Sequence, residues 1–202
     1  MTRSGRRWMS RAFSSLEAVA GGAAVFVDAN IFLYHFLGRS EECTRFLERC
    51  ASGDVRGATG AHILAEVLHR SMIFEARSKK VAGGGAAGGA GTAGKARREV
   101  RKVEAVEILR ASPEAVRKLT DYNAAAGAII DMGFSVFPLT AEVVKAGQWI
   151  RARSGLMVND SLVIATMRIY GLSALATADK GFGGVEGVEL YGPTDLGAAG
   201  GP

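Results

Sequence analysis

The sequence predicts an α/β fold in which a mostly parallel sheet is covered by helices on both faces. Short apolar segments alternate along the chain with longer segments whose apolar residues recur at helical spacing. The first pattern is typical of strands buried on both faces, and the second of amphipathic helices. With 202 residues, 48% of them hydrophobic, the chain is long enough to bury one sizeable core.

The expected elements follow this alternation from the first strand to the last. Strands are expected at residues 24–28, 55–59, 134–138, 174–177 and 188–190. Helices are expected at residues 31–37, 41–51, 62–72, 96–110, 112–131, 140–153 and 160–170. Ser112, followed by Pro and Glu, is a good helix start, and Thr140 and Asn159 are the expected caps of later helices. Gly133 and Gly171 are expected to end helices.

Composition divides the chain into one central domain with appendages. The domain is expected at residues 23–192, after a basic leader at residues 1–22 that need not be ordered, and before a flexible tail at residues 193–202. A flexible Gly/Ala-rich insertion is expected at about residues 78–95, where AGGGAAGGAGTAG has too little apolar surface to order itself. The insertion and the leader could contact a polyanion, bind a protein partner or be inert.

The net charge of +5 is unevenly distributed along the chain. Residues 1–12 carry four Arg and no acid, and residues 77–118 carry eleven Lys or Arg against four Glu. The rest of the chain is therefore acidic. Such a layout suggests a polyanion held at the periphery and cations held at the centre. The competing interpretation is that the basic residues only solvate exposed helices.

The sequence favours a cytoplasmic protein without disulfides or structural zinc. The apolar stretch from Ala18 to Val27 is short and is followed by Asp28, so it cannot span a membrane. Cys43 and Cys50 are seven positions apart in a helical pattern, too far for a disulfide between them, and no CxxC pair is present.

Four carboxylates stand where a parallel sheet would place a ligand site. Such sites lie beyond the carboxyl ends of the strands. Asp28 ends the first strand, Glu66 is on the helix after the second, Asp160 opens a helix, and Asp179 follows the strand ALAT. Each has an ordinary explanation alone, such as helix capping, turn formation or a solvent-facing helix position.

Together the four carboxylates favour a divalent metal site. Glu66 and Asp160 are flanked by apolar residues, and carboxylates next to a core are costly unless paired or bound to metal. Carboxylate oxygens suit Mg²⁺ or Mn²⁺. A reaction that uses such a cluster is phosphodiester hydrolysis.

Four stretches of the sequence resemble, in order, the motif blocks of PIN-domain nucleases, most of all the VapC-like toxin branch. They are VFVDANIFLY, TGAHILAEVLHR, GLMVNDSLVIATMRIYGL and LATADKGF. The resemblance implies a three-layer α/β/α sandwich and a Mg²⁺- or Mn²⁺-dependent endoribonuclease that cleaves single-stranded RNA. It places the family's acidic residues on Asp28, Glu66, Asp160 and Asp179. The resemblance also implies two partners. One is a small antitoxin that blocks the groove, and the other is a second copy of the chain in a homodimer.

The resemblance also suggests roles for individual residues. Asp28 and Asp160 would hold the principal metal with Asp179, while Glu66 would bind a second metal or orient the attacking water. The supporting residues would be Asn30 and Thr177, which would hydrogen bond to the site, and Ser161, which could position substrate or simply cap its helix.

Other functions remain open at this point. The Glu-x-x-His pattern of Glu66 to His69 occurs in di-iron bundles, but a second such motif is missing. A haloacid-dehalogenase-like phosphatase would need Asp-x-Asp where this chain has Asp28-Ala29-Asn30. An RNA-processing nuclease and a PIN-like scaffold that binds RNA or protein without cleaving are the remaining alternatives to a toxin.

Overall fold

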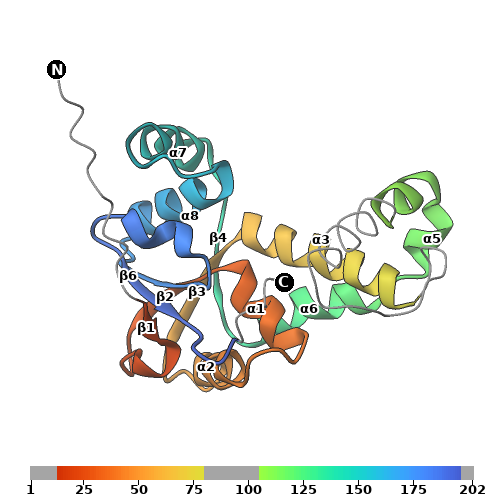
Figure 1. The fold of residues 1–202 in the computed structure, drawn as a ribbon, viewed down its shortest axis with the longest axis horizontal. Coiled ribbons are helices and arrows are strands. Elements are labelled where there is room, and N and C mark those ends of the chain that lie inside the picture. Colours follow the sequence, from red (N-terminus) through yellow and green to blue (C-terminus); the bar gives the residue numbers. More distant parts are fainter. Residues whose placement is uncertain (1–12, 80–104, 197–202) are drawn as a thin grey trace. The chain divides into compact units, whose positions relative to one another are not determined.

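The structure is a computed structural model that describes residues 13–79 and 105–196 (Figure 1). It divides into two compact units, the first made of residues 1–64 and 129–202 and the second of residues 65–128. Most of the predicted insertion, the first twelve residues of the predicted leader and the end of the predicted tail lie outside the described residues.

The first unit contains a six-stranded sheet in which every pairing is parallel. Its order is β1-β6-β5-β2-β3-β4. The strands are β1 (Ser14–Ser15), β2 (Ala24–Val27), β3 (Arg56–Gly60), β4 (Ser135–Phe137), β5 (Ala174–Ala176) and β6 (Glu189–Gly192). The predicted parallel sheet is confirmed, and the central strand β2 is buried as expected, with Val25, Phe26 and Val27 fully inaccessible to solvent.

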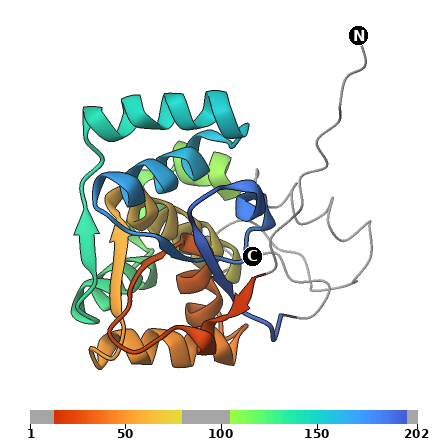
Figure 2. The ribbon, with the colours of Figure 1, turned by 90° about the vertical axis from the view of Figure 1, so that its left-hand side faces the viewer.

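Helices cover both faces of this sheet. Figures 1 and 2 show α1 (Ala29–Phe36) and α2 (Glu41–Ala51) on one side, and α7 (Ala141–Ser154) and α8 (Val158–Ile169) on the other. The unit also has two short 3₁₀ helices, η1 (Leu16–Ala18) and η2 (Lys180–Gly184), and the start of α3 (Ala61–Ser78). The three-layer α/β/α fold is therefore confirmed.

Helix α2 shows how local sequence sets an element. The Ser40 hydroxyl caps it by accepting a hydrogen bond from the Cys43 amide at 3.0 Å. Its buried side carries Cys43, Phe46, Leu47 and Cys50, which repeat at helical spacing. Both cysteines are free and buried, as predicted.

Residues 14–18, within the predicted leader, belong to the ordered sheet and to η1. Leu16 is fully buried, and its amide donates to the Glu42 carboxylate at 2.8 Å. The same carboxylate accepts hydrogen bonds from the Ser15 hydroxyl and from the amide and hydroxyl of Thr194. Burial alone would raise the pKa of Glu42, but these hydrogen bonds outweigh it and lower the pKa.

The second unit is helical and has its own small core. It contains most of α3, a helical segment at residues 105–111, α5 (Pro113–Arg117) and the start of α6 (Asp121–Asp131). Its core residues are Ala76, Leu109, Ala115 and Leu119.

The prediction of one helix over residues 112–131 is wrong, because the chain turns between α5 and α6. The buried Glu75 carboxylate on α3 accepts hydrogen bonds from the Thr120 amide at 2.8 Å and the Tyr122 amide at 2.9 Å. These amides lie at the start of α6, so Glu75 satisfies donors that would otherwise be unpaired at a helix N-terminus. No described helix of either unit is long and apolar enough to cross a membrane.

Candidate active site

Asp28 lies where β2 ends and α1 begins, and only 9% of it is exposed. Its Oδ1 accepts a hydrogen bond from the Ala29 amide at 2.8 Å, which caps α1. Its Oδ2 accepts hydrogen bonds from the Asn30 amide group at 2.6 Å and the Thr177 hydroxyl at 2.7 Å. Asp28 thus caps α1 through Oδ1. The hydrogen bonds to Oδ2 form a polar network that capping alone does not need.

Thr177 connects this network to the end of the neighbouring strand. It is fully buried just after β5, and its Oγ1 accepts a hydrogen bond from the Asp179 amide at 3.0 Å. Asn30 closes the network from the other side, because its Oδ1 accepts from the Ala178 amide at 2.9 Å. The structure therefore brings Asp28, Asn30, Thr177 and the backbone of Asp179 together.

Asp179 is exposed and caps the short helix η2. Its Oδ1 accepts a hydrogen bond from the Gly181 amide at 2.8 Å. A Cβ added to Gly181 would lie 3.1 Å from this oxygen, so the absence of a side chain leaves room for the carboxylate. The motif blocks gave no role to Gly181, although the turn-forming ADKG sequence indicated a tight turn.

Asp160 is half-buried in the first turn of α8. The prediction that Asn159 caps this helix is wrong, because α8 begins at Val158 and its N-cap is Met157, without a capping hydrogen bond from a side chain. Helix α8 continues through a short turn into β5. Its start therefore lies toward the edge of the sheet where β2 and β5 end, on the same side as Asp28 and Asp179.

Ser161 is fully buried, so its hydroxyl faces the interior. The hydroxyl donates to the Val158 carbonyl at 2.6 Å and accepts from Arg151 Nη1 at 2.8 Å. Ser161 thereby ties the first turn of α8 to α7. Arg151 was not anticipated, since nothing in the motif pattern singles out this residue ten positions before Ser161.

Glu66 lies on α3, within the second unit. Its carboxylate is 26% exposed and lies 3.4 Å from Nε of Arg70, one helical turn later. Ion pairs between residues four positions apart are common on ordinary helices, so this contact needs no catalytic role. The convergence of Glu66 with the three aspartates stays a prediction.

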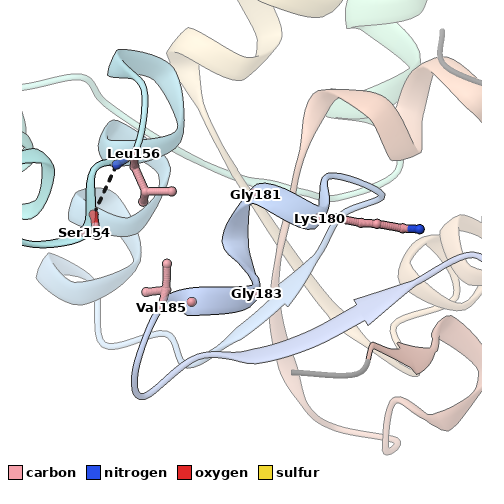
Figure 3. A pocket seen from close by; sticks show the side chains of 7 residues that line it. Ser154, Leu156, Lys180, Gly181, Gly183 and Val185 are labelled. Atoms are coloured by element: carbon pink, nitrogen blue, oxygen red, sulfur yellow. Dashed lines mark hydrogen bonds between the residues drawn. The ribbon is translucent and has the colours of Figure 1, made fainter. Parts of the chain in front are cut away.

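A pocket of about 260 Å³ lies in the first unit (Figure 3). One wall comes from Ser154, the last residue of α7, and from Leu156 in the α7–α8 connection, and the other from η2 and the residue after it. The segment before the Asp160 helix and the segment after Asp179 therefore lie side by side. Lys180 contributes to the lining, but its side chain extends away from Ser154 and Leu156.

The PIN domain family matches residues 25–188 of this sequence, which is most of the chain. The chain belongs to the PIN-domain family. No curated protein sequence gives a significant match.

Two solved structures are similar to this PIN domain at low sequence identity. VapBC2 from Rickettsia felis, crystallised with a DNA fragment from its promoter, is 12% identical with a TM-score of 0.51, over 84% of this chain and 98% of that one. A toxin-antitoxin complex from Klebsiella pneumoniae is 16% identical with a TM-score of 0.46, over 81% of this chain and 94% of that one.

The donor atoms of this PIN domain suit a hard divalent cation. Asp28, Asp160 and Asp179 offer carboxylate oxygens at one edge of one sheet, which is the ligand type that Mg²⁺ and Mn²⁺ prefer. Within residues 13–79 and 105–196, no three His, Cys, Asp or Glu side chains are spaced to hold a metal ion. The oxygen donors are of the type that such a cation prefers, whereas their spacing does not form a coordination site, so metal binding stays a prediction.

His62 is a half-buried residue of this PIN domain with buried ring nitrogens, and the resemblance gave it no role. Neither of its ring nitrogens has a hydrogen-bond partner within the described structure. Burial lowers the pKa of His62, so the neutral imidazole is favoured. The ring fits against Gly60, where an added Cβ would lie 2.5 Å from Cε1. The histidine therefore packs at the end of β3.

Proposed function

We propose that this PIN domain is a Mg²⁺- or Mn²⁺-dependent endoribonuclease that hydrolyses single-stranded RNA in the cytoplasm. The observation that carries the proposal is the hydrogen-bonded link from Asp28 through Thr177 to the Asp179 backbone. This link joins the Asp28 carboxylate to the Asp179 backbone at the carboxyl ends of the adjacent parallel strands β2 and β5. Parallel sheets bind ligands beyond the carboxyl ends of their strands.

We propose for the individual residues the roles that the resemblance implies. Asp28, Asp160 and Asp179 hold the cation, and Glu66 holds a second one or orients the attacking water. A divalent cation in such a site supplies Lewis acidity for the scissile phosphate and lowers the pKa of water. Asn30 and Thr177 keep the Asp28 carboxylate oriented through their hydrogen bonds to Oδ2. Ser161 positions the start of α8 through Val158 and Arg151.

A cleavage assay with single-stranded RNA tests this site. In Mg²⁺, Asp28→Asn and Asp160→Asn are expected to lower the rate by at least about 100-fold, because each removes a charged oxygen ligand. Asp131→Asn is the matched control, since Asp131 is exposed at the end of α6, just before β4 begins at the opposite edge of the sheet. Cleavage at the wild-type rate in both Asp28→Asn and Asp160→Asn would contradict the proposed site. Binding of RNA without cleavage by the wild-type chain would instead support a non-cleaving scaffold.

We further propose that the nuclease is the toxin of a VapBC-type pair, held inactive by a small antitoxin. The support is the fold shared with VapBC2 from Rickettsia felis, at a TM-score of 0.51. Expression of the chain alone is expected to arrest growth, and Asp28→Asn is expected to abolish the arrest. Normal growth, with cleavage intact in vitro, would favour an RNA-processing nuclease.

A homodimer is the proposed assembly. The sequence from Ala124 to Ile130 on α6 is apolar, and Ile130 is 57% exposed, so we take this part of α6 as the interface of the proposed dimer. Light scattering of the full chain is expected to give the mass of two copies, and Ile130→Lys to give the mass of one. A monomeric wild-type chain at micromolar concentration would contradict the proposal.

A further inference from the structure

The pocket between the α7–α8 connection and η2 has a lining that suits a flat, uncharged group. Leu156 and Val185 supply its aliphatic surface, and Gly181, Gly183 and Gly184 of η2 line the opposite side without side chains. Lys180 is the charged residue of the lining, and Figure 3 shows its side chain extending away from Leu156. An aliphatic wall opposite peptide groups offers a heterocycle both packing surface and hydrogen-bonding partners.

The size of the pocket suits a small ligand, such as a single nucleobase. Its volume of about 260 Å³ is below the roughly 300–1,000 Å³ of sites that enclose a drug-sized ligand. Its walls are also rigidly placed. Ser154 Oγ donates to the Ile150 carbonyl at 2.7 Å, and Val185 is 4% exposed, with its amide donating to the Phe182 carbonyl at 3.0 Å.

The position of the pocket connects it to the proposed reaction. Its η2 wall begins at Lys180, the residue after Asp179, and its other wall ends at Leu156, four residues before Asp160. A base in the pocket would therefore lie between the two segments that lead to Asp160 and away from Asp179. Positioning a substrate through a group that does not react is a common source of specificity.

We propose that this pocket is a nucleobase subsite, which binds one unpaired base of single-stranded RNA next to the scissile phosphate. The proposal rests on the nuclease function proposed above, because it assigns the substrate as RNA. An unpaired base can enter the pocket, whereas a base within a duplex is stacked and paired, so the subsite also accounts for a preference for single strands.

Equilibrium binding tests the subsite without requiring cleavage. The probes are a fluorescent single-stranded RNA hexamer and the same sugar-phosphate backbone without bases, with Ca²⁺ present. Leu156→Trp, which fills the pocket, is expected to weaken binding of the intact hexamer about tenfold and to leave binding of the abasic backbone unchanged. Leu156→Ala is expected to act in the same direction more weakly, and it serves if the Trp variant does not fold.

Ile169→Trp is the matched control, because it adds the same indole at the far end of α8, where Ile169 is 36% exposed. It is expected to bind both probes as the wild type does. Equal loss of both probes in Leu156→Trp would indicate a phosphate site, and unchanged binding of the intact hexamer would indicate an empty surface hollow. Either result overturns the proposal.

A parallel cleavage assay separates this proposal from the nuclease itself. Suppose that Leu156→Trp weakens binding of the intact hexamer alone, but the wild-type chain does not cleave RNA in Mg²⁺. The nuclease proposal would then be wrong and the subsite proposal would stand. If Leu156→Trp cleaves every tested RNA sequence at the wild-type rate, the nuclease proposal stands and the subsite proposal is wrong. If both proposals hold, kcat/KM falls about tenfold in Leu156→Trp and falls no further when the base next to the cut is removed.

Discussion

The Thr177 hydroxyl makes more contacts within the candidate site than its size suggests. It donates to Asp28 at 2.7 Å and accepts from the Asn30 side chain at 3.1 Å and the Asp179 amide at 3.0 Å. We expect Thr177→Val to lower kcat/KM for RNA cleavage about 10- to 100-fold, because Asp28 loses the donor that orients it. Thr177→Ser keeps the hydroxyl and is expected to recover most of the activity.

A buried threonine elsewhere separates this effect from simple destabilisation. Thr166 is 1% exposed, and its hydroxyl donates to the Leu162 carbonyl within α8. Thr166→Val is therefore expected to cost a similar amount of stability, about 1 kcal/mol, and to leave cleavage unchanged. Equal loss of activity in both valine variants would mean that Thr177 acts through stability alone.

At the residue scale, the sequence indicated the hydrogen-bonded network around Asp28 and Thr177. It did not indicate contacts that depend on how separate elements pack against each other. Asn30 and Thr177 were predicted to support the site by hydrogen bonds, and both contact Asp28. Arg151 was not predicted, because its contact with Ser161 depends on how α7 and α8 pack. The metal roles of the carboxylates remain predictions, since side-chain convergence depends on rotamers and bound ions that sequence does not encode.

Glu75 illustrates, at the scale of elements, how one carboxylate can hold two helices together. Burial alone would raise its pKa, but the hydrogen bonds from Lys79 and from the Thr120 and Tyr122 amides outweigh burial and lower the pKa to about 2. The ordinary value is 4.5, so the contribution to stability is fully present above pH 4.5 and is lost as pH falls toward 2. The full contribution is on the order of 3 kcal/mol.

Urea unfolding of the full chain at several pH values checks this contribution. Glu75→Gln is expected to lower the free energy of unfolding at pH 7 by about 1–3 kcal/mol and to flatten its decline between pH 4.5 and 3. Glu114→Gln is the control, because its side chain is 79% exposed and lies 3.7 Å from Arg117. The assignment is wrong if Glu75→Gln and the wild type lose stability in parallel as the pH falls.

The elements that sequence predicted well have strong local signals, and the ones it missed depend on contacts distant in sequence. Helix α2 has the predicted bounds, because Ser40 caps it and its apolar positions repeat at helical spacing. The break between α5 and α6 was missed, since the Glu75 carboxylate that stabilises it is 45 positions away from Thr120. Strand β1 was missed for a similar reason, because two residues carry no periodicity and are fixed by pairing with β6.

At the scale of the whole molecule, the charge distribution predicts how RNA binding responds to salt. Residues 77–118 carry eleven Lys or Arg against four Glu, while the segments outside them and the leader are acidic overall. An acidic catalytic region repels RNA unless cations or basic segments offset it. Each phosphate contact that a basic side chain makes releases counterions, so affinity should fall steeply with salt concentration.

Neutralising five basic residues near the Gly/Ala-rich stretch tests which part of the chain supplies these contacts. The substitutions to Gln are at Lys95, Arg97, Arg98, Arg101 and Lys102. If all five contact phosphates, the slope of log Kd against log salt concentration should fall by about 3.5, from the roughly 0.7 expected per contact with a single strand. A variant with Gln at the four arginines of residues 1–12 tests the leader in the same way. We expect the first variant to change the slope more, because its charges are denser. An unchanged slope would show that this basic segment is inert toward RNA.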